Sequence, residues 1–258
     1  MDYEGFKIEI YNLSGINLSF YKEKQMKRRI ESLIIKNGYE LFDEYIKVLK
    51  TNQKLYNEFI NYLTINVSEF YRNPAQWEVL KNDIFPFLLK KFGKLKIWSA
   101  ACSTGDEPYT LVMVLNEYVP LKDIKVIATD IDKEALRKAK DGIYTEKSIE
   151  KLPREYLDKY FIREGSIYTI KEEVRNQVIF SQHDMLKEMY PSECDMIVCR
   201  NVLIYFTEEA KVNIYNQFNK ALKKEGILFV GSTEQIIMAN RYKFSPLKTF
   251  FYIKDGDL

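Results

Sequence analysis

From Leu95 onward, short apolar runs alternate with segments of helical spacing, and this alternation restricts the fold more than any other feature of the chain. Alternating strands and helices predict a parallel sheet covered by helices on both faces. The runs interpreted as strands are residues 96–100, 125–129, 178–181, 196–199, 227–231 and a last edge strand over 249–254. The helical segments between them include residues 108–118, 133–139 and 208–222.

The first seventy residues contain no convincing strand and repeat apolar side chains at helical spacing. Met26, Ile30 and Leu33 share one helical face, and Phe59 and Leu63 share another. We therefore predict a helical domain and link over residues 1–75, and a further helix over 77–91 follows the link. The sheet domain is predicted over residues 76–258. Polar, alternating residues at about 160–178 predict a small antiparallel β-subdomain within it.

Composition excludes several classes of site. The chain has a single histidine, His183, and three cysteines without a C-x-x-C pair, which disfavours metal sites, disulfides and His-dependent catalytic pairs. No apolar run approaches 18 residues, and the first residues lack the basic and apolar stretches of a signal peptide. We expect a cytoplasmic protein without bound metal or direct membrane insertion.

The loop after the first predicted strand, Ser99-Ala-Ala-Cys-Ser-Thr-Gly-Asp-Glu-Pro108, predicts a ligand-binding turn. Its small residues, Ala100 among them, let a ligand approach the backbone, and Gly105 can adopt positive φ. It lacks G-x-G-x-x-G, and Asp106 and Glu107 would repel a pyrophosphate, which disfavours a nicotinamide-dependent dehydrogenase. A ligand with a positive group, such as S-adenosylmethionine, fits better. The alternative is an ordinary loop whose acids favour the helix dipole.

The second predicted strand ends in Asp130, where an acid that binds ribose hydroxyls follows such a loop. Asp132 stands directly before the helical pattern that begins at Lys133, and it is interpreted as the N-cap of that helix. Asp130 is too early for that role. The loop and Asp130 together predict a nucleoside-binding edge.

Three stretches in this order make the chain resemble the chemotaxis receptor methyltransferase family (CheR). They are Asn66-Val-Ser-Glu-Phe-Tyr-Arg72, Ser99–Tyr109 and Cys199-Arg-Asn-Val-Leu-Ile-Tyr-Phe206. The resemblance implies an α/β fold: a class I S-adenosylmethionine-dependent methyltransferase, a Rossmann-like doubly wound sheet with a small antiparallel β-subdomain and an N-terminal all-helical domain. It also implies methylation of protein glutamates, with S-adenosylhomocysteine as the second product.

The resemblance assigns roles to residues at matching positions. Two departures are Ser68, where the family usually has Thr, and Asp184, where it usually has Asn beside the adenine; the second leaves open how the base is recognised. The residues assigned to the cofactor are Asn66, Ser68, Arg72, Ala100, Glu107, Asp130, Asp184, Met185, Arg200 and Asn201.

Arg72 and Tyr205 are predicted to be catalytic. A glutamate carboxylate is already anionic at neutral pH, so methyl transfer to it requires positioning and desolvation rather than a general base. We expect both side chains to hold the incoming carboxylate. The alternatives are an interdomain salt bridge for Arg72 and an aromatic core position for Tyr205.

Lys24, Lys27 and Arg28 form a predicted basic helix face opposite Met26 and Ile30. Given the resemblance, this face is predicted to bind the acidic helical cytoplasmic domain of a methyl-accepting chemotaxis receptor. The alternative is a solvated surface. Nucleic acid is disfavoured because no stacking aromatics are interleaved with these charges.

Some family members dock a receptor tether peptide on the β-subdomain, and the shortness of the segment here disfavours tethering. We expect a monomer. Two competing hypotheses remain open: a class I methyltransferase with another acceptor, and a non-catalytic S-adenosylmethionine-binding regulator.

Overall fold

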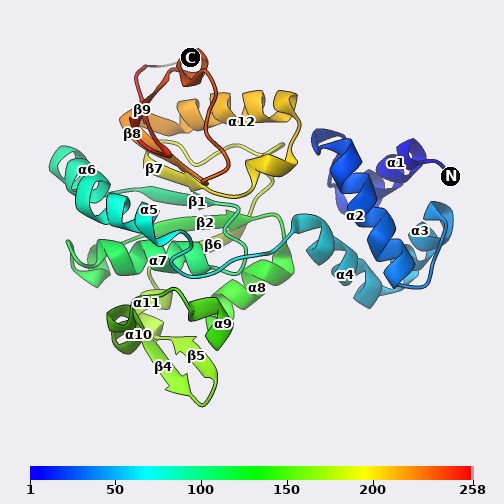
Figure 1. Ribbon diagram of the computed structural model, residues 1–258, viewed down its shortest axis with the longest axis horizontal. Coiled ribbons are helices and arrows are strands. Elements are labelled where there is room, and N and C mark those ends of the chain that lie inside the picture. The colour runs from blue at the N-terminus through cyan, green and yellow to red at the C-terminus, as the bar shows by residue number, and fades with distance from the viewer. Residues whose placement is uncertain (257–258) are drawn as a thin grey trace. The chain divides into compact units, whose positions relative to one another are not determined.

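The computed structural model describes residues 1–256, and the chain divides into two compact units (Figure 1). We call the first the helical unit; it contains Met1–Asn66 and a later segment, Leu203–Asn213. The second, the sheet unit, contains Val67–Val202 and the chain from Ile214 onward. No helix within residues 1–256 combines the length and apolar character needed to cross a membrane.

The helical unit is built from α1 (Tyr3–Ser14), α2 (Glu23–Lys36), α3 (Phe42–Thr51) and α4 (Gln53–Thr64). Helix α1 begins and ends at favourable capping residues. The Asp2 side chain accepts the N–H of Gly5 at 2.9 Å, and α1 ends at Gly15 with φ 76°. Ile30, Leu33 and Phe59 are almost fully buried, as the helical spacing predicts. The predicted all-helical domain is confirmed.

A short segment from far along the sequence completes the helical unit. Its backbone pairs with the chain between α1 and α2: the N–H of Lys22 donates to the carbonyl of Tyr205 at 2.9 Å, and that of Thr207 to Phe20 at 2.8 Å. The rings of Tyr21 and Phe206 also lie 4.9 Å apart. The segment includes a 3₁₀ turn, η4 (Leu203–Tyr205), and the start of α12 (Glu208–Ala221).

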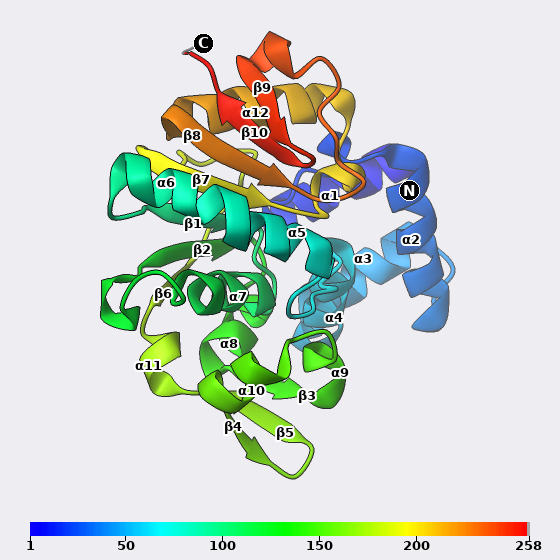
Figure 2. The same ribbon diagram turned by 60° about the vertical axis from the view of Figure 1, so that its left-hand side comes forward.

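The sheet unit contains a seven-stranded sheet in the order β6-β2-β1-β7-β8-β10-β9 (Figure 2). Strands β6, β2, β1, β7 and β8 are parallel, whereas β10 runs antiparallel to both of its neighbours. The predicted doubly wound α/β sheet is confirmed. The strand bounds are β1 Ile97–Ala100, β2 Val126–Asp130, β6 Val178–Gln182, β7 Cys194–Cys199, β8 Leu222–Val230, β9 Phe244–Lys248 and β10 Phe251–Lys254.

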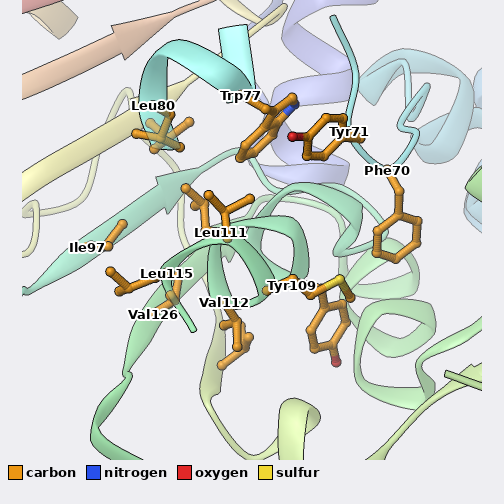
Figure 3. Close-up of a cluster of buried hydrophobic side chains, with 14 of the residues drawn as sticks. Phe70, Tyr71, Trp77, Leu80, Ile97, Tyr109, Leu111, Val112, Leu115 and Val126 are labelled. Carbon is orange, nitrogen blue, oxygen red and sulfur yellow. The ribbon is translucent and has the colours of Figure 1, made fainter. Parts of the chain in front are cut away.

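Helices α5 (Pro74–Val79) and α6 (Phe85–Phe92) pack with α7 (Asp106–Leu115) against the sheet. Figure 3 shows Trp77, Leu111 and Val126 as members of one apolar cluster. The predicted helix over residues 77–91 is interrupted by a π-helical turn over Leu80–Ile84, so it is not one continuous α-helix. Helix α8 (Lys133–Asp141) contacts β2 and β6, and its N-cap is Asp132, as predicted.

A small antiparallel sheet in the order β3-β5-β4 lies outside the main sheet. The hairpin of β4 (Phe161–Glu164) and β5 (Ile167–Ile170) confirms the predicted antiparallel excursion, and β3 (Ile143–Thr145) adds a third strand from earlier in the chain. Short helices surround these strands: α9 Glu146–Ile149, α10 Arg154–Tyr160 and α11 Glu172–Arg175.

The prediction of an edge strand at residues 249–254 is wrong in its position. Strand β10 lies inside the sheet, between β8 and β9, and β9 forms the edge. Residues 244–248 do not read as a strand because they contain Pro246 and mostly exposed positions. Proline is tolerated only where its missing N–H has no ladder partner, which an edge provides.

Gly105 and Gly165 give a matched test of packing. Both have positive φ. A Cβ at Gly105 would lie 2.9 Å from the Ala139 Cβ, whereas a Cβ at Gly165 would have no atom of a non-adjacent residue within 4 Å among the described residues. We expect Gly105→Ala to lower the free energy of unfolding by about 2–4 kcal/mol through backbone strain plus overpacking. Gly165→Ala should cost about 1 kcal/mol from strain alone. Urea unfolding of both variants measures the difference; equal losses would contradict it.

Candidate functional site

The candidate site lies in the sheet unit, at the carboxyl ends of β1, β2 and β7. From β1 the chain adds β2 and β6 on one side, and it later returns to place β7 on the other side of β1. The loops after β1 and β7 therefore diverge at this edge. Such a reversal of strand order is where doubly wound sheets bind ligands.

The loop after β1 has an unusual backbone that brings its N–H groups close to β2. Ala101, Ser103 and Gly105 all have positive φ, at 59°, 49° and 90°. The N–H of Cys102 donates to the Thr129 carbonyl at 2.9 Å, and that of Ser103 to the Asp130 carboxylate at 2.7 Å. The loop is thus fixed to the end of β2.

Asp130 ends β2 and is nearly buried. Besides Ser103, the N–H of Asp132 donates to its carboxylate at 2.9 Å. Burial raises the pKa of Asp130 to about 6, although hydrogen bonds from Asp132, Ser103 and Ile131 favour the charged form. A carboxylate accepts about four hydrogen bonds, so capacity remains for a ligand hydroxyl. This is the chemistry of a ribose-binding acid.

Glu107, on the first turn of α7, is held between β1 and β7. The Ser99 hydroxyl donates to its Oε1 at 2.8 Å, and the Arg200 guanidinium lies 3.5 Å from its Oε2. Burial raises the pKa of Glu107, and the charge of Arg200 opposes that rise. Glu107 therefore offers an oriented carboxylate whose negative charge is only partly compensated.

Arg200, the first residue after β7, uses the donors of its Nη atoms on the protein, and its buried Nε has no partner among the described residues. Its Nη2 donates to the Gln76 side chain at 2.6 Å and to the Arg72 carbonyl at 2.7 Å. Arg200 therefore fixes the backbone of Arg72, whose own half-buried guanidinium donates to the carbonyl of Val67 at 3.2 Å.

Ser68 and Thr104 both hydrogen-bond Asp106. The Thr104 hydroxyl donates to the Asp106 carboxylate at 2.6 Å, and the Ser68 hydroxyl also bonds to this group. Burial raises the pKa of Asp106. The structure thus brings the link residue Ser68 to the loop after β1, as a partner of its acid.

Asp184 and Met185 follow β6, the neighbour of β2. The N–H of His183 donates to the Asp130 carbonyl at 3.0 Å, which connects this loop to the end of β2. The Asp184 carboxylate accepts the N–H of Leu186 at 2.9 Å, and its Oδ2 lies 3.8 Å from the Lys187 ammonium. An ionised Asp184 has no N–H to donate, so an adenine here would be read through donors of the base or of the backbone.

Asn201 follows Arg200 and adopts φ 62°. Its Oδ1 is buried and has no hydrogen-bond partner within the part of the chain that the structure describes. A buried acceptor without a donor is costly, and a ligand donor such as an ammonium group would satisfy it. This orphaned oxygen and the three acids suit a ligand that carries positive charge and hydroxyls.

The remaining predicted residues belong to the helical unit. The Asn66 amide donates to the Thr64 hydroxyl at 3.0 Å, and Tyr205 ends η4. On α2, Lys24 and Arg28 are exposed, whereas the Lys27 ammonium lies 5.5 Å from the centre of the Tyr3 ring. Lys27 is thus the least free of the three cations.

Two site residues were missed in the sequence. Ser99 lies in the predicted loop, but its bond to Glu107 depends on β1 and α7 meeting. Gln76 binds Arg200, 124 residues away, and no sequence signal links them. Cys102 and Cys199 are buried beside the site, which agrees with a role as small core residues. Burial raises the pKa of both thiols.

The sheet order with its reversed strand β10, the acidic edge and the buried Asp130 at the end of β2 together define a class of protein: the class I S-adenosylmethionine-dependent methyltransferases. The residues fit this cofactor. Asp130 can accept a ribose hydroxyl, Glu107 and Asp106 provide negative charge, and Asn201 provides the unpaired acceptor.

Comparison with known proteins identifies the family. The model of the CheR methyltransferase SAM binding domain matches residues 66–252, and that of the CheR methyltransferase all-alpha domain matches residues 1–64. The chain is 42% identical to a chemotaxis protein methyltransferase of Listeria innocua, over 98% of this chain and 97% of that protein. It is 34% identical to that of Escherichia coli, over 87% and 81%. The chain therefore belongs to the CheR methyltransferase family.

The raised pKa of Asp130 predicts a pH dependence of cofactor binding. Below pH 6 the carboxyl gains a proton and accepts hydroxyl hydrogens less well. S-adenosylhomocysteine should therefore bind about 10-fold more weakly at pH 5 than at pH 8. Calorimetric titration across this range measures it. Asp130→Asn should bind weakly with a much flatter pH profile; an unchanged profile would assign the effect to another carboxyl.

Proposed function

We propose that this methyltransferase esterifies glutamate side chains of methyl-accepting chemotaxis receptors, giving glutamate methyl esters and S-adenosylhomocysteine. Membership of the CheR family and the names of its relatives, chemotaxis protein methyltransferases, support the role in chemotaxis. The observation that carries the choice of acceptor is the chemistry of the edge: its carboxylates are already bonded to protein donors and fit the cofactor, and its thiols are protonated.

The histidine and the thiols near this edge are poor candidates for a general base. The chain has one histidine, His183, whose Nε2 lies 3.2 Å from the Met189 carbonyl. Burial raises the thiol pKa of Cys102 and Cys199, so both are protonated at neutral pH. An acceptor that must lose a proton would have to use a carboxylate that the cofactor also needs, such as Asp130 or Glu107. A carboxylate arrives already ionised and needs no deprotonation.

When bound, S-adenosylmethionine supplies a methyl group on a positively charged sulfur. Asp130 would hold the ribose, and Glu107, oriented by Ser99, would bind a positively charged part of the cofactor. Methyl transfer to a carboxylate neutralises one positive and one negative charge. Exclusion of water by the buried edge favours such a reaction, because desolvated charges gain most from neutralisation.

Arg72 and Tyr205 are proposed to hold the acceptor carboxylate, each through its own side chain. The backbone of Arg72 is fixed by Arg200, while its guanidinium is half-buried and donates to a single carbonyl at the limit of good geometry. A guanidinium can therefore still offer two parallel donors to a carboxylate. A phenol at Tyr205 can supply one further donor.

The exposed cations of α2 are proposed to dock the receptor. Lys24 and Arg28 lie on the solvent side of a helix whose other face, including Met26 and Ile30, is buried. Helical receptor segments that carry several glutamates are acidic, so opposite charge would speed and orient association. We further propose that the enzyme acts as a monomer in the cytoplasm.

The first test uses methyl-labelled S-adenosylmethionine and a chemoreceptor cytoplasmic fragment. We expect label on the fragment that mild base releases as volatile methanol, because carboxyl methyl esters are base-labile. Label that resists base would instead support another acceptor group. Binding of S-adenosylhomocysteine without transfer would support a non-catalytic regulator.

The same assay separates the proposed catalytic side chains from structural ones. Loss of a hydrogen bond to a charged group predicts kcat roughly 10- to 100-fold lower for Arg72→Ala and Tyr205→Phe. Tyr118→Phe is the matched control, since the Tyr118 hydroxyl donates to the carbonyl of Lys81 at the surface. Wild-type kcat in the first two variants would refute their roles.

Docking through α2 predicts a salt-dependent defect. Lys24→Glu/Arg28→Glu should raise KM for the receptor fragment roughly 10-fold at low salt, with the difference shrinking as salt screens the charges. The variant should retain kcat and its affinity for S-adenosylhomocysteine. Lys122→Glu/Lys138→Glu, two exposed lysines of the sheet unit, makes the same change in net charge. Equal KM values for both variants would contradict docking by α2.

A further inference from the structure

Glu234 joins the ends of two neighbouring strands at the candidate site. It follows β8 and is 5% exposed. Its carboxylate accepts three backbone N–H groups: Asn201 at 2.5 Å and Gly231 at 2.9 Å on Oε2, and Val202 at 2.7 Å on Oε1. We call these three bonds the Glu234 clamp. It connects the turn after β7 to the turn after β8.

The backbone of the second turn is shaped to hold this carboxylate. The N–H of Glu234 donates to the Gly231 carbonyl at 3.0 Å, which closes the turn. A Cβ at Gly231 would lie 2.4 Å from the Glu234 Oε2 and 2.7 Å from the Asn201 nitrogen. Only glycine therefore leaves room for the clamp, and Gly231 and Glu234 depend on each other.

The clamp acts on a backbone that would not hold its shape alone. Asn201 adopts φ 62°, in the left-handed region that costs free energy for a residue with a Cβ. Two hydrogen bonds to a carboxylate, at Asn201 and Val202, offset that cost because bonds to charged acceptors are the strong ones. The clamp thus fixes the direction in which the chain leaves β7.

The turn of Asn201 and Val202 adjoins residues of the proposed reaction site. Arg200, directly before it, bonds Glu107 and the backbone of Arg72. Asn201 presents a buried, unpartnered Oδ1. Along the chain, Val202 is the last residue of the sheet unit before the segment that carries Tyr205. A change of the turn would therefore displace several groups together.

We propose that Glu234 is a positioning residue for methyl transfer, which acts through the backbone of Asn201 and Val202 without touching substrate or cofactor. The inference rests on the proposed function for its kinetic readout. Small errors in the placement of reacting groups reduce the rate far more than they reduce binding. Glu234 should therefore affect kcat more than ligand affinity.

The test uses Glu234→Gln, which keeps the shape of the side chain but places an NH₂ group against one backbone donor. We expect kcat lower by roughly 10-fold or more, with KM for the receptor fragment and the Kd of S-adenosylhomocysteine changed less than about 3-fold. Amide hydrogen exchange of Asn201 and Val202 should accelerate. Gly231→Ala should give the same pattern, and its effect should be less than additive with that of Glu234→Gln, because both break one clamp.

Asp195→Asn is the matched control at the opposite end of β7. Asp195 is also buried, and its carboxylate accepts the N–H of Lys96 at 2.7 Å and pairs with Lys223 at 2.8 Å. This substitution should lower thermal stability. It should leave kcat unchanged when kcat is calculated for the fraction of protein that binds S-adenosylhomocysteine.

Wild-type kcat in Glu234→Gln would overturn the inference. A fall in kcat that only matches a fall in the fraction of protein able to bind S-adenosylhomocysteine would do the same, since it would indicate partial unfolding. If wild-type protein does not methylate the fragment, the proposed function fails on its own. Unchanged amide exchange at Asn201 and Val202 would then still overturn the clamp, and faster exchange would support it.

Discussion

The buried guanidinium of Arg200 is the contact on which the site in the sheet unit depends. It lies beside Glu107 at the start of α7 and donates to Gln76 and to the backbone of Arg72. Removing one partner from a buried, hydrogen-bonded charge is far more costly than the pair is stabilising, because the remaining charge is left unsolvated. Arg200 therefore holds the link residues, the start of α7 and the end of β7 in fixed positions relative to one another.

Around this contact, several carboxyl groups are buried, and burial disfavours their ionised form. Burial raises the pKa of Asp106, Glu107 and Asp130, so the ionised forms cost folding free energy at neutral pH. For Asp130, stability is gained as pH falls from about 6 towards the unfolded value near 4 and is lost as pH rises again. A cofactor with positive charge and hydroxyls would recover part of that cost, which explains why the acids gather at this edge.

Backbone strain is placed at the same edge. Ala101, Ser103 and Asn201 all adopt positive φ in the loops after β1 and β7, and hydrogen bonds to the carboxylates of Asp130 and Glu234 fix Ser103 and Asn201. The acids of this edge thus have two physical roles. Some place negative charge at the ends of the strands, and others hold loops whose conformation the local sequence does not favour.

The sequence by itself determined the parallel sheet, the helical domain and the acidic loop, because hydrophobic periodicity and small or acidic residues act locally. Asp132 as the N-cap of α8 followed in the same way. Only the tertiary structure decided that Gln76 meets Arg200, that β10 lies inside the sheet, and that Leu203–Asn213 completes the helical unit. These features depend on contacts between residues far apart in the chain, and no local pattern records which distant partner will satisfy a buried charge or an open strand edge.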